Sequence, residues 1–136
     1  RKGVYTKDFS WGFYCTNNME QAKKWALRHK ESPTINIYEY IENRDLKVLK
    51  FKEMNDEWLD FIVKCRSGEV HDYDIVEGPM ADDTIWNFLQ DYLANEISRE
   101  VFWQLIKFRY PNHQISFHTL RALDCLKFVE SRKLYE

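Results

Sequence analysis

The apolar residues of this chain change their spacing repeatedly, from alternate positions to every third or fourth position, and this limits the fold most strongly. In 12-GFYCTNNMEQAKKWA-26, Phe13 and Cys15 share one parity, which is typical of a half-buried strand. Asn17 or Asn18 can then cap a helix by accepting a backbone N–H bond. Helical spacing follows at Ala22, Trp25, Ala26 and His29. The stretch therefore predicts a strand that leads directly into a helix.

Alternating residues predict further strands at 34–41, 46–51, 73–76 and 114–118. The first two flank a polar turn, and we expect them to form an antiparallel hairpin. Gly78-Pro79 is expected to stop the strand at 73–76.

Helical spacing predicts four more helices, with Asp82 or Asp83, Ser98 and Thr119 as capping residues of the last three. Their core stripes are Trp58, Phe61, Ile62 and Cys65; Ile85, Phe88, Leu89 and Tyr92; Phe102, Leu105 and Ile106; and Ala122, Cys125, Leu126 and Val129. Strands and helices alternate without a repeat or a linker, so we predict one α+β domain over residues 1–136.

Composition excludes several classes of protein. The 136 residues are 44% hydrophobic with only 4 glycines and 3 prolines, which argues against a disordered chain. The 20 basic and 22 acidic residues are interspersed, so no basic stripe marks a nucleic-acid-binding domain, although a nucleic-acid substrate stays open. No apolar run approaches the roughly 20 residues that span a bilayer, and RKGVYTKDFS has no signal-peptide core. We therefore expect no membrane partner.

The cysteines and histidines predict no special chemistry. Cys15, Cys65 and Cys125 are far apart and lie at apolar positions, which favours buried, reduced thiols. The four histidines have no H-x-x-x-H spacing and pair with no cysteine, so we expect no metal. A cytoplasmic location fits both expectations.

Two strands carry polar side chains of matching parity. If Ile115 and Phe117 face the core, Gln114, Ser116 and His118 face the other way. The same geometry puts Tyr14 and Thr16 opposite Phe13 and Cys15. These polar side chains line one cleft if the two strands are neighbours; a solvated sheet face is the commoner outcome.

Three blocks of the sequence carry a resemblance to a known family. They are 8-DFSWGFYCTNNMEQAKKWA-26, 73-YDIVEGPMADD-83 and 114-QISFHT-119. Together they resemble an uncharacterised bacterial domain family related to ADP-ribosyltransferases, whose first block reads D-F-G-x-G-F-Y-x-T. The resemblance implies an ADP-ribosyltransferase-like split, bent β-sheet with flanking helices that holds NAD in a cleft, without metal.

The resemblance also implies roles for particular residues. Tyr14 would stack on the nicotinamide of NAD, and Thr16 would lie near the adjacent ribose. Gln114 stands where these folds usually carry a catalytic glutamate, so Tyr14 and Gln114 are the catalytic candidates. Ser116 and His118 share the parity of Gln114 and are further candidates for NAD binding.

The chain departs from the family pattern at three places. Gln114 lacks the charge of a glutamate, and Ser10 replaces a glycine, which is expected to alter the turn before the strand. A Y-H-G-type first strand is not seen after Arg1, so either the sequence is trimmed or the first strand is lacking and the NAD grip is incomplete.

Two functional classes follow from these observations. The first is an NAD-dependent mono-ADP-ribosyltransferase, or an NAD-cleaving relative, that modifies a bacterial protein or nucleic acid. One form of this hypothesis is a toxin-type effector with an antitoxin partner. The second is a catalytically lapsed module of the same fold that binds a nucleotide or a protein. Gln114 and the missing histidine strand favour the second class, and Tyr14 with Gln114 in family register favours the first.

Overall fold

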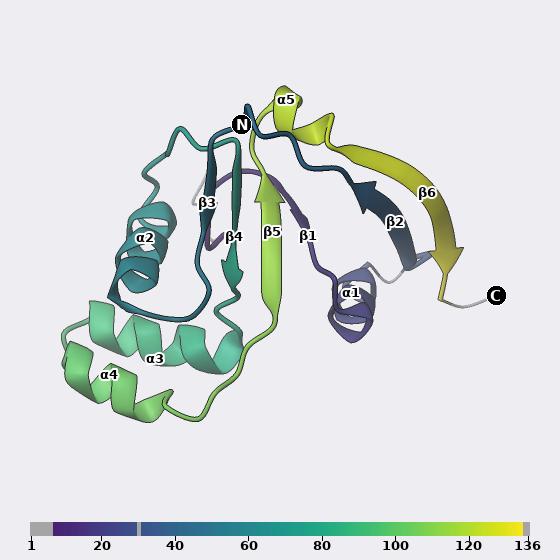
Figure 1. The fold of residues 1–136 in the computed structure, drawn as a ribbon. Helices are drawn as coiled ribbons and strands as arrows, with labels where there is room; N and C mark the ends of the chain where they lie inside the picture. Colours follow the sequence, from purple (N-terminus) through teal and green to yellow (C-terminus); the bar gives the residue numbers. More distant parts are fainter. Residues whose placement is uncertain (1–6, 30, 135–136) are drawn as a thin grey trace.

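The strands of the protein form two separate sheets in a computed structural model that describes residues 7–29 and 31–134 (Figure 1). The larger sheet has four strands in the order β1 (Phe13–Cys15), β5 (His113–Phe117), β4 (Ile75–Pro79) and β3 (Val48–Lys50). β5 is antiparallel to both of its neighbours, whereas β3 and β4 are parallel, so the sheet is mixed. The smaller sheet pairs β2 (Thr34–Tyr40) antiparallel with β6 (Leu126–Lys133).

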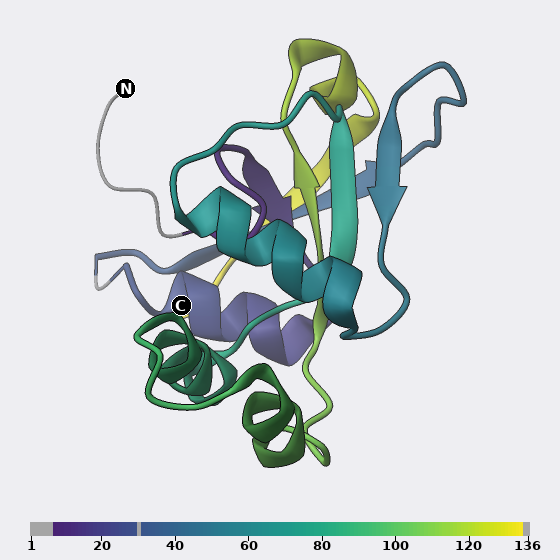
Figure 2. The ribbon, with the colours of Figure 1, turned by 90° about the vertical axis from the view of Figure 1, so that its left-hand side faces the viewer.

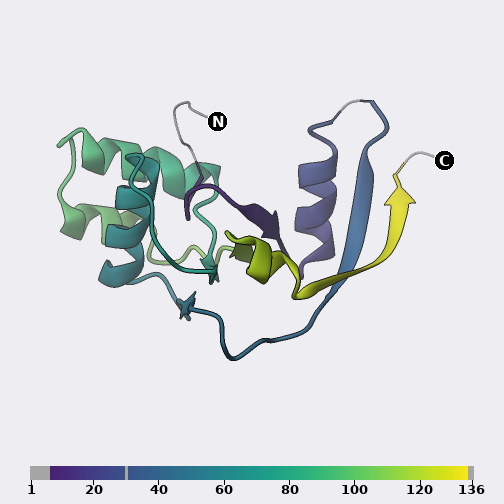
Figure 3. The ribbon, with the colours of Figure 1, turned by 90° about the horizontal axis from the view of Figure 1, so that it is seen from above.

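Helices cover one side of the larger sheet, and the smaller sheet lies on its other side (Figures 1 and 3). The helices on the first side are α2 (Asp56–Arg66), α3 (Asp83–Leu93) and α4 (Arg99–Leu105). α2 runs across the face of the sheet, as the view from that side shows (Figure 2). α1 (Met19–Ala26) packs beside β2, and the short α5 (Leu120–Leu123) joins β5 to β6.

Two apolar clusters fill the two faces of the larger sheet. The cluster on the helical side is built around Trp58, Leu59, Ile85, Leu89 and Phe102, with Val76 contributed by β4. The cluster on the other side is formed by Leu46, Ile75, Phe117, Ala122 and Cys125. Because both faces are covered, the polar face predicted for β5 is not solvated.

Helix ends follow the predicted capping chemistry. A side-chain oxygen accepts a hydrogen bond from the backbone N–H three residues further on at Asn18, Asn55, Asp82, Ser98 and Thr119. Asp82, rather than Asp83, is the cap of α3, so the prediction that this pair serves the helix start is confirmed for Asp82.

The predicted hairpin between 34–41 and 46–51 is wrong. β2 pairs with β6, which comes from the far end of the chain, and β3 pairs parallel with β4. The segment between β2 and β3 crosses from one sheet to the other: Ile41 donates its N–H to Cys125, and Lys47 accepts from Asp74. The polar turn at 42–45 allowed a hairpin, but each strand pairs with a distant strand instead. The local sequence of a strand does not indicate its partner.

Two element ends also differ from the prediction. β4 continues through Gly78-Pro79, where Pro79 lies opposite His113 and beyond the end of β3, so its missing N–H leaves no bond unmade on that side. The last predicted helix ends at Leu123, and Leu126 and Val129 belong to β6. Residues 126–133 form a strand despite this helical spacing because β2 supplies a partner for each of them except Val129, where the register shifts.

Candidate functional site

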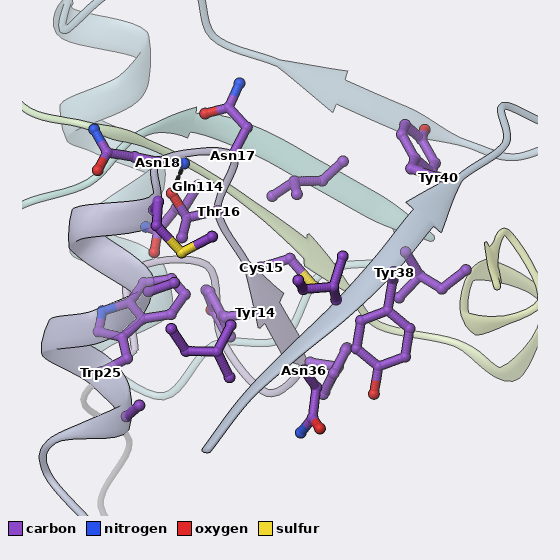
Figure 4. A pocket seen from close by; sticks show the side chains of 18 of the residues that line it. Tyr14, Cys15, Thr16, Asn17, Asn18, Trp25, Asn36, Tyr38, Tyr40 and Gln114 are labelled. Atoms are coloured by element: carbon purple, nitrogen blue, oxygen red, sulfur yellow. Dashed lines mark hydrogen bonds between the residues drawn. The ribbon is translucent and has the colours of Figure 1, made fainter. Parts of the chain in front are cut away.

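A hollow of about 710 Å³ lies between the two sheets, and we call it the inter-sheet hollow (Figure 4). Strands β1 and β5 form one wall, β2 the opposite wall, and α1 one end. Most of its lining is apolar or aromatic, and the lining includes Phe13, Tyr14, Thr16, Trp25, Asn36, Tyr38 and Gln114. The ring of Phe13 meets that of Tyr38 edge-on at 5.7 Å across the gap.

A second hollow of about 490 Å³ adjoins the first, and we call it the polar hollow. Its lining comes from the segment before β1, the last turn of α1, the end of α2 and the start of α3. Five residues line both hollows, namely Phe13, Tyr14, Trp25, His29 and Gln114. Tyr14 and Gln114 therefore border a shared space, as the sequence predicted if their strands were neighbours.

Both the hydroxyl and the ring of Tyr14 contact other residues. Its hydroxyl donates to the carbonyl oxygen of Ser10 at 2.6 Å and accepts from the N–H of Phe9 at 3.0 Å. Its ring lies 6.4 Å from the ring of Phe9 and meets His118 edge-on at 6.3 Å. The hydroxyl is engaged in the loop before β1, and the ring packs against the apolar cluster on the helical side of the larger sheet.

Gln114 is only 5% exposed, and a buried carboxylate fixes its orientation. Its Nε2 donates to Oδ2 of Asp8 at 3.0 Å. A carboxylate accepts and does not donate, so the nitrogen of the amide must face Asp8 and the oxygen must face away from it. The carbonyl oxygen of Gln114 is thus turned away from Asp8, and the residue lines both hollows.

Asp8 itself is buried, and every side of its carboxylate is occupied. It accepts from Nε of Arg66 at 2.9 Å and from Nη2 of the same guanidinium, and the Ala81 N–H donates to it at 2.8 Å. The Arg66 guanidinium also stacks on Trp86 at 3.8 Å from the ring centroid. Arg66 neutralises the charge that Asp8 brings into the interior, as a buried carboxylate requires.

Thr16 lies at the inter-sheet hollow alone. Its hydroxyl donates to the carbonyl of His113 at 3.2 Å and accepts from the N–H of Asn18 at 3.1 Å. The two bonds hold the end of β1 to the first residue of β5 and to the cap of α1. A contact between Thr16 and a ribose stays a prediction, and the ribose would compete with these two bonds for the Thr16 hydroxyl.

Ser116 and His118 line neither hollow. Ser116 is fully buried, with its Oγ 3.1 Å from the Val76 carbonyl oxygen and 2.6 Å from Nε2 of His118. Nδ1 of His118 bonds to the carbonyl oxygen of Trp11, which only accepts, so Nδ1 carries the proton. Burial lowers the pKa of His118 to about 4, so the ring is neutral. His118 thus supports the loop before β1 and Ser116 bonds to His118, and a contact between these two side chains and NAD stays a prediction.

The loop 8-DFSWG-12 is the feature that sequence reasoning missed. Side chains from other elements hold each of its central carbonyl oxygens: His71 bonds to that of Phe9, Tyr14 to that of Ser10, and His118 to that of Trp11. Gly12 approaches His118 so closely that a Cβ atom would lie 2.7 Å from the ring. Asp8 and Gly12 both belong to the first family block, so the sequence did mark this loop. A loop motif does not indicate which distant residues will contact it.

Ser10 keeps the turn that the family glycine suggested. Its φ angle is +77°, in the left-handed region that favours glycine. The expectation that serine alters the turn stays a prediction, since the chain holds Ser10 in a conformation that glycine adopts readily. The bonds to both neighbouring residues and to its own carbonyl hold Ser10 in place.

The cysteines are not poised for nucleophilic chemistry. Burial raises the pKa of Cys15 to about 11 and that of Cys65 to about 12, and it also raises the pKa of Cys125. Among the described residues, no group of three or more histidine, cysteine or acidic side chains is arranged to hold a metal ion. No helix within residues 7–29 and 31–134 has the length and apolar character needed to cross a membrane.

The two sheets, the helices on one of them and the hollow between them define an α+β protein with an inter-sheet pocket. The chain belongs to the family described as "Protein of unknown function (DUF3990)", which matches residues 1–128. No curated protein and no solved structure matches the sequence. The predicted membership of an uncharacterised domain family is thus confirmed, whereas these comparisons show no link to ADP-ribosyltransferases.

Proposed function

We propose that this protein is an NAD-dependent mono-ADP-ribosyltransferase, or an NAD-cleaving relative, with an ADP-ribosyltransferase-like split sheet. One observation carries the proposal: Tyr14 and Gln114, from neighbouring strands, line both the inter-sheet hollow and the polar hollow. The resemblance of three sequence blocks to relatives of these transferases supports it independently. A toxin-type role with an antitoxin partner belongs to the same proposal.

The inter-sheet hollow has the size and lining that a nucleotide with two rings requires. Ligand pockets are commonly about 300–1,000 Å³, mostly apolar, with a few polar groups that fix orientation. The hollow offers the aromatic faces of Trp25 and Tyr38 for rings and the amide of Asn36 for polar groups. Nicotinamide would stack on Tyr14, whose ring has little conformational freedom to lose because its hydroxyl is already bonded.

The reaction needs positioning and a local electron-rich group more than it needs acid catalysis. When the bond between nicotinamide and the ribose carbon breaks, its electron pair stays on the nicotinamide nitrogen and neutralises the ring. Positive charge then develops on the ribose until an acceptor bonds to that carbon and loses its proton to water. The protein would contribute orientation through Tyr14 and electrostatic stabilisation through the carbonyl oxygen of Gln114.

Asp8 makes Gln114 better suited to that role. It holds Nε2, so Oε1 is presented as an acceptor for a ribose hydroxyl. The carboxylate also draws the N–H toward it, which increases the negative partial charge on the amide oxygen. Asp8 is a positioning residue in this mechanism because Gln114 stands between it and the substrate.

The test is nicotinamide release from NAD by the full-length protein, followed by chromatography. We expect Tyr14→Ala to lower the rate at least about tenfold, because an oriented aromatic face is worth about 1.4 kcal/mol or more at the transition state. Tyr110→Ala is the matched control, since Tyr110 is 84% exposed and lines neither hollow. Release that is insensitive to Tyr14→Ala would remove the basis of the proposal.

A lapsed nucleotide-binding module is the second candidate, because Gln114 cannot supply the charge of a glutamate. Gln114→Glu alone would set two carboxylates about 3.0 Å apart, which disfavours both being ionised. The double variant Asp8→Asn with Gln114→Glu restores one donor and one acceptor between the two positions, at the cost of the bond from the Ala81 N–H to the same atom, and Arg66 remains beside it. Activity in this variant but not in the parent would identify a lapsed site; lower activity in the variant would favour Gln114 as a working residue.

A further inference from the structure

The polar hollow carries an excess of positive charge although the whole chain has a net charge of -2. Asp8 and Arg66 lie in it but neutralise each other. Lys7 and Arg28 form no ion pair with any residue in the described part of the chain, and Asp83 is the only other acidic side chain of the lining there. The uncompensated charge of this small space therefore suits an anion.

Aromatic rings accompany these charges. Tyr14, Trp25 and Trp86 all line the polar hollow. Nζ of Lys7 lies 5.5 Å from the centroid of the Tyr14 ring, so a cation and a stacking surface occupy the same spot. Phosphate-binding cations interleaved with aromatic faces are the chemistry by which proteins hold unpaired nucleotides. An acidic peptide would use the cations but would leave the rings without a stacking partner.

The position of the polar hollow relative to the inter-sheet hollow suits a second substrate. The shared wall contains both Tyr14 and Gln114, the two residues proposed to hold the reacting end of NAD. A group bound in the polar hollow therefore shares the wall that is proposed to hold the reacting end of NAD. At about 490 Å³, the space is of the order that one nucleotide unit, rather than a folded strand, would occupy.

We propose that the polar hollow binds the acceptor of ADP-ribosyl transfer, and that this acceptor is an unpaired nucleotide unit of a nucleic acid. The inference rests on the proposed function. A base nitrogen would form the new bond to the ribose carbon as the bond to nicotinamide breaks, and the proton of that nitrogen would pass to water. Lys7 and Arg28 bind the phosphates, and Trp86 stacks on the base with the face that the Arg66 guanidinium does not cover.

The test uses a fluorescein-labelled, ten-nucleotide single-stranded DNA of mixed sequence, with binding followed by anisotropy. The charge-reversed variant Lys7→Glu/Arg28→Glu is expected to bind at least about tenfold more weakly than the parent, since each lost phosphate contact costs affinity. The control Arg44→Glu/Lys52→Glu changes the net charge equally at exposed positions outside both hollows and is expected to stay within about threefold. Equal losses in the two variants would overturn the proposal.

Two further measurements separate the inference from the function beneath it. NAD affinity is measured in the same variants: a fall as large as that for DNA would mean that the polar hollow holds the phosphates of NAD itself and would overturn the inference. Competition by a ten-residue polyglutamate as strong as that by unlabelled DNA would point to a protein acceptor and would also overturn it. Absence of nicotinamide release in the parent, with DNA binding intact, would reject the transferase function while upholding the nucleotide site.

Discussion

Replacing Ser10 by glycine is expected to stabilise the protein by about 1–2 kcal/mol. Ser10 has a φ of +77°, and the left-handed region costs a residue with a Cβ atom about 1–2 kcal/mol. Its side chain is buried, and its hydroxyl has no hydrogen-bond partner among the described residues, which adds a desolvation cost of about 1 kcal/mol or more. Glycine offsets part of this gain, by about 0.5–1 kcal/mol, because it is more flexible in the unfolded chain.

The assay is thermal or urea unfolding of the parent and of three variants. For a chain of this size, the gain corresponds to an increase in Tm of about 3–6 °C. Ser32 also has a positive φ, +51°, but is exposed, so Ser32→Gly measures the backbone contribution alone and should gain less. Ser10→Ala removes the hydroxyl and keeps the Cβ atom, so it measures the burial contribution alone.

The reasoning fails if Ser10→Gly stabilises no more than Ser10→Ala, because the backbone would then contribute nothing. It also fails if Ser10→Gly lowers Tm, since that would mean the serine side chain holds the loop. The main-chain bond from Tyr14 to residue 10 is available to glycine, so no loss of that contact is expected.

Three further predictions concern the loop and the buried groups. Tyr14→Phe should lower the free energy of unfolding by about 1–3 kcal/mol, because two loop groups lose their partner, whereas Tyr110→Phe should be neutral; urea titration compares them. The pKa of His118 is lowered to about 4 in the folded protein, so its stabilising contribution is complete above about pH 6.5 and is lost as the pH falls toward 4; the loss, discounted for partial exposure, is about 1–2 kcal/mol. Unfolding curves of His118→Asn, which keeps a donor for Trp11, should lack that pH dependence. Because the pKa of Cys65 is about 12 and that of Cys15 about 11, iodoacetamide at pH 8 should label neither in the native protein within minutes, and both after denaturation, as mass spectrometry will show.

The helices and their caps could be predicted because the interactions that define them are local. An oxygen of Ser98 or Thr119 bonds to an N–H three residues away, and an apolar stripe needs only its own helix to be recognised. Period-two spacing also predicted β1 and β5 as strands, and it placed Tyr14 and Gln114 on one face on the condition, met in the structure, that the two strands are neighbours.

Strand partners were beyond the sequence for the opposite reason. β2 pairs with β6, which lies at the far end of the chain. The segment after Thr119 has helical spacing, but its pairing with β2 makes residues 126–133 a strand. Asp8 shows the same limit at the candidate site, since nothing near it in sequence indicates that Arg66 and Gln114 will meet there.

The sequence by itself therefore determined the α+β class, the helix starts and the parity of Tyr14 and Gln114 within their own strands, all of which depend on spacings of a few residues. Only the tertiary structure decided that the face carrying Tyr14 and Gln114 is covered by the loop 8–12, that Ser116 and His118 lie beneath that loop, and that two hollows meet at Tyr14. Such features depend on which distant segments exclude water from one another, and burial between segments has no periodic signature in the chain.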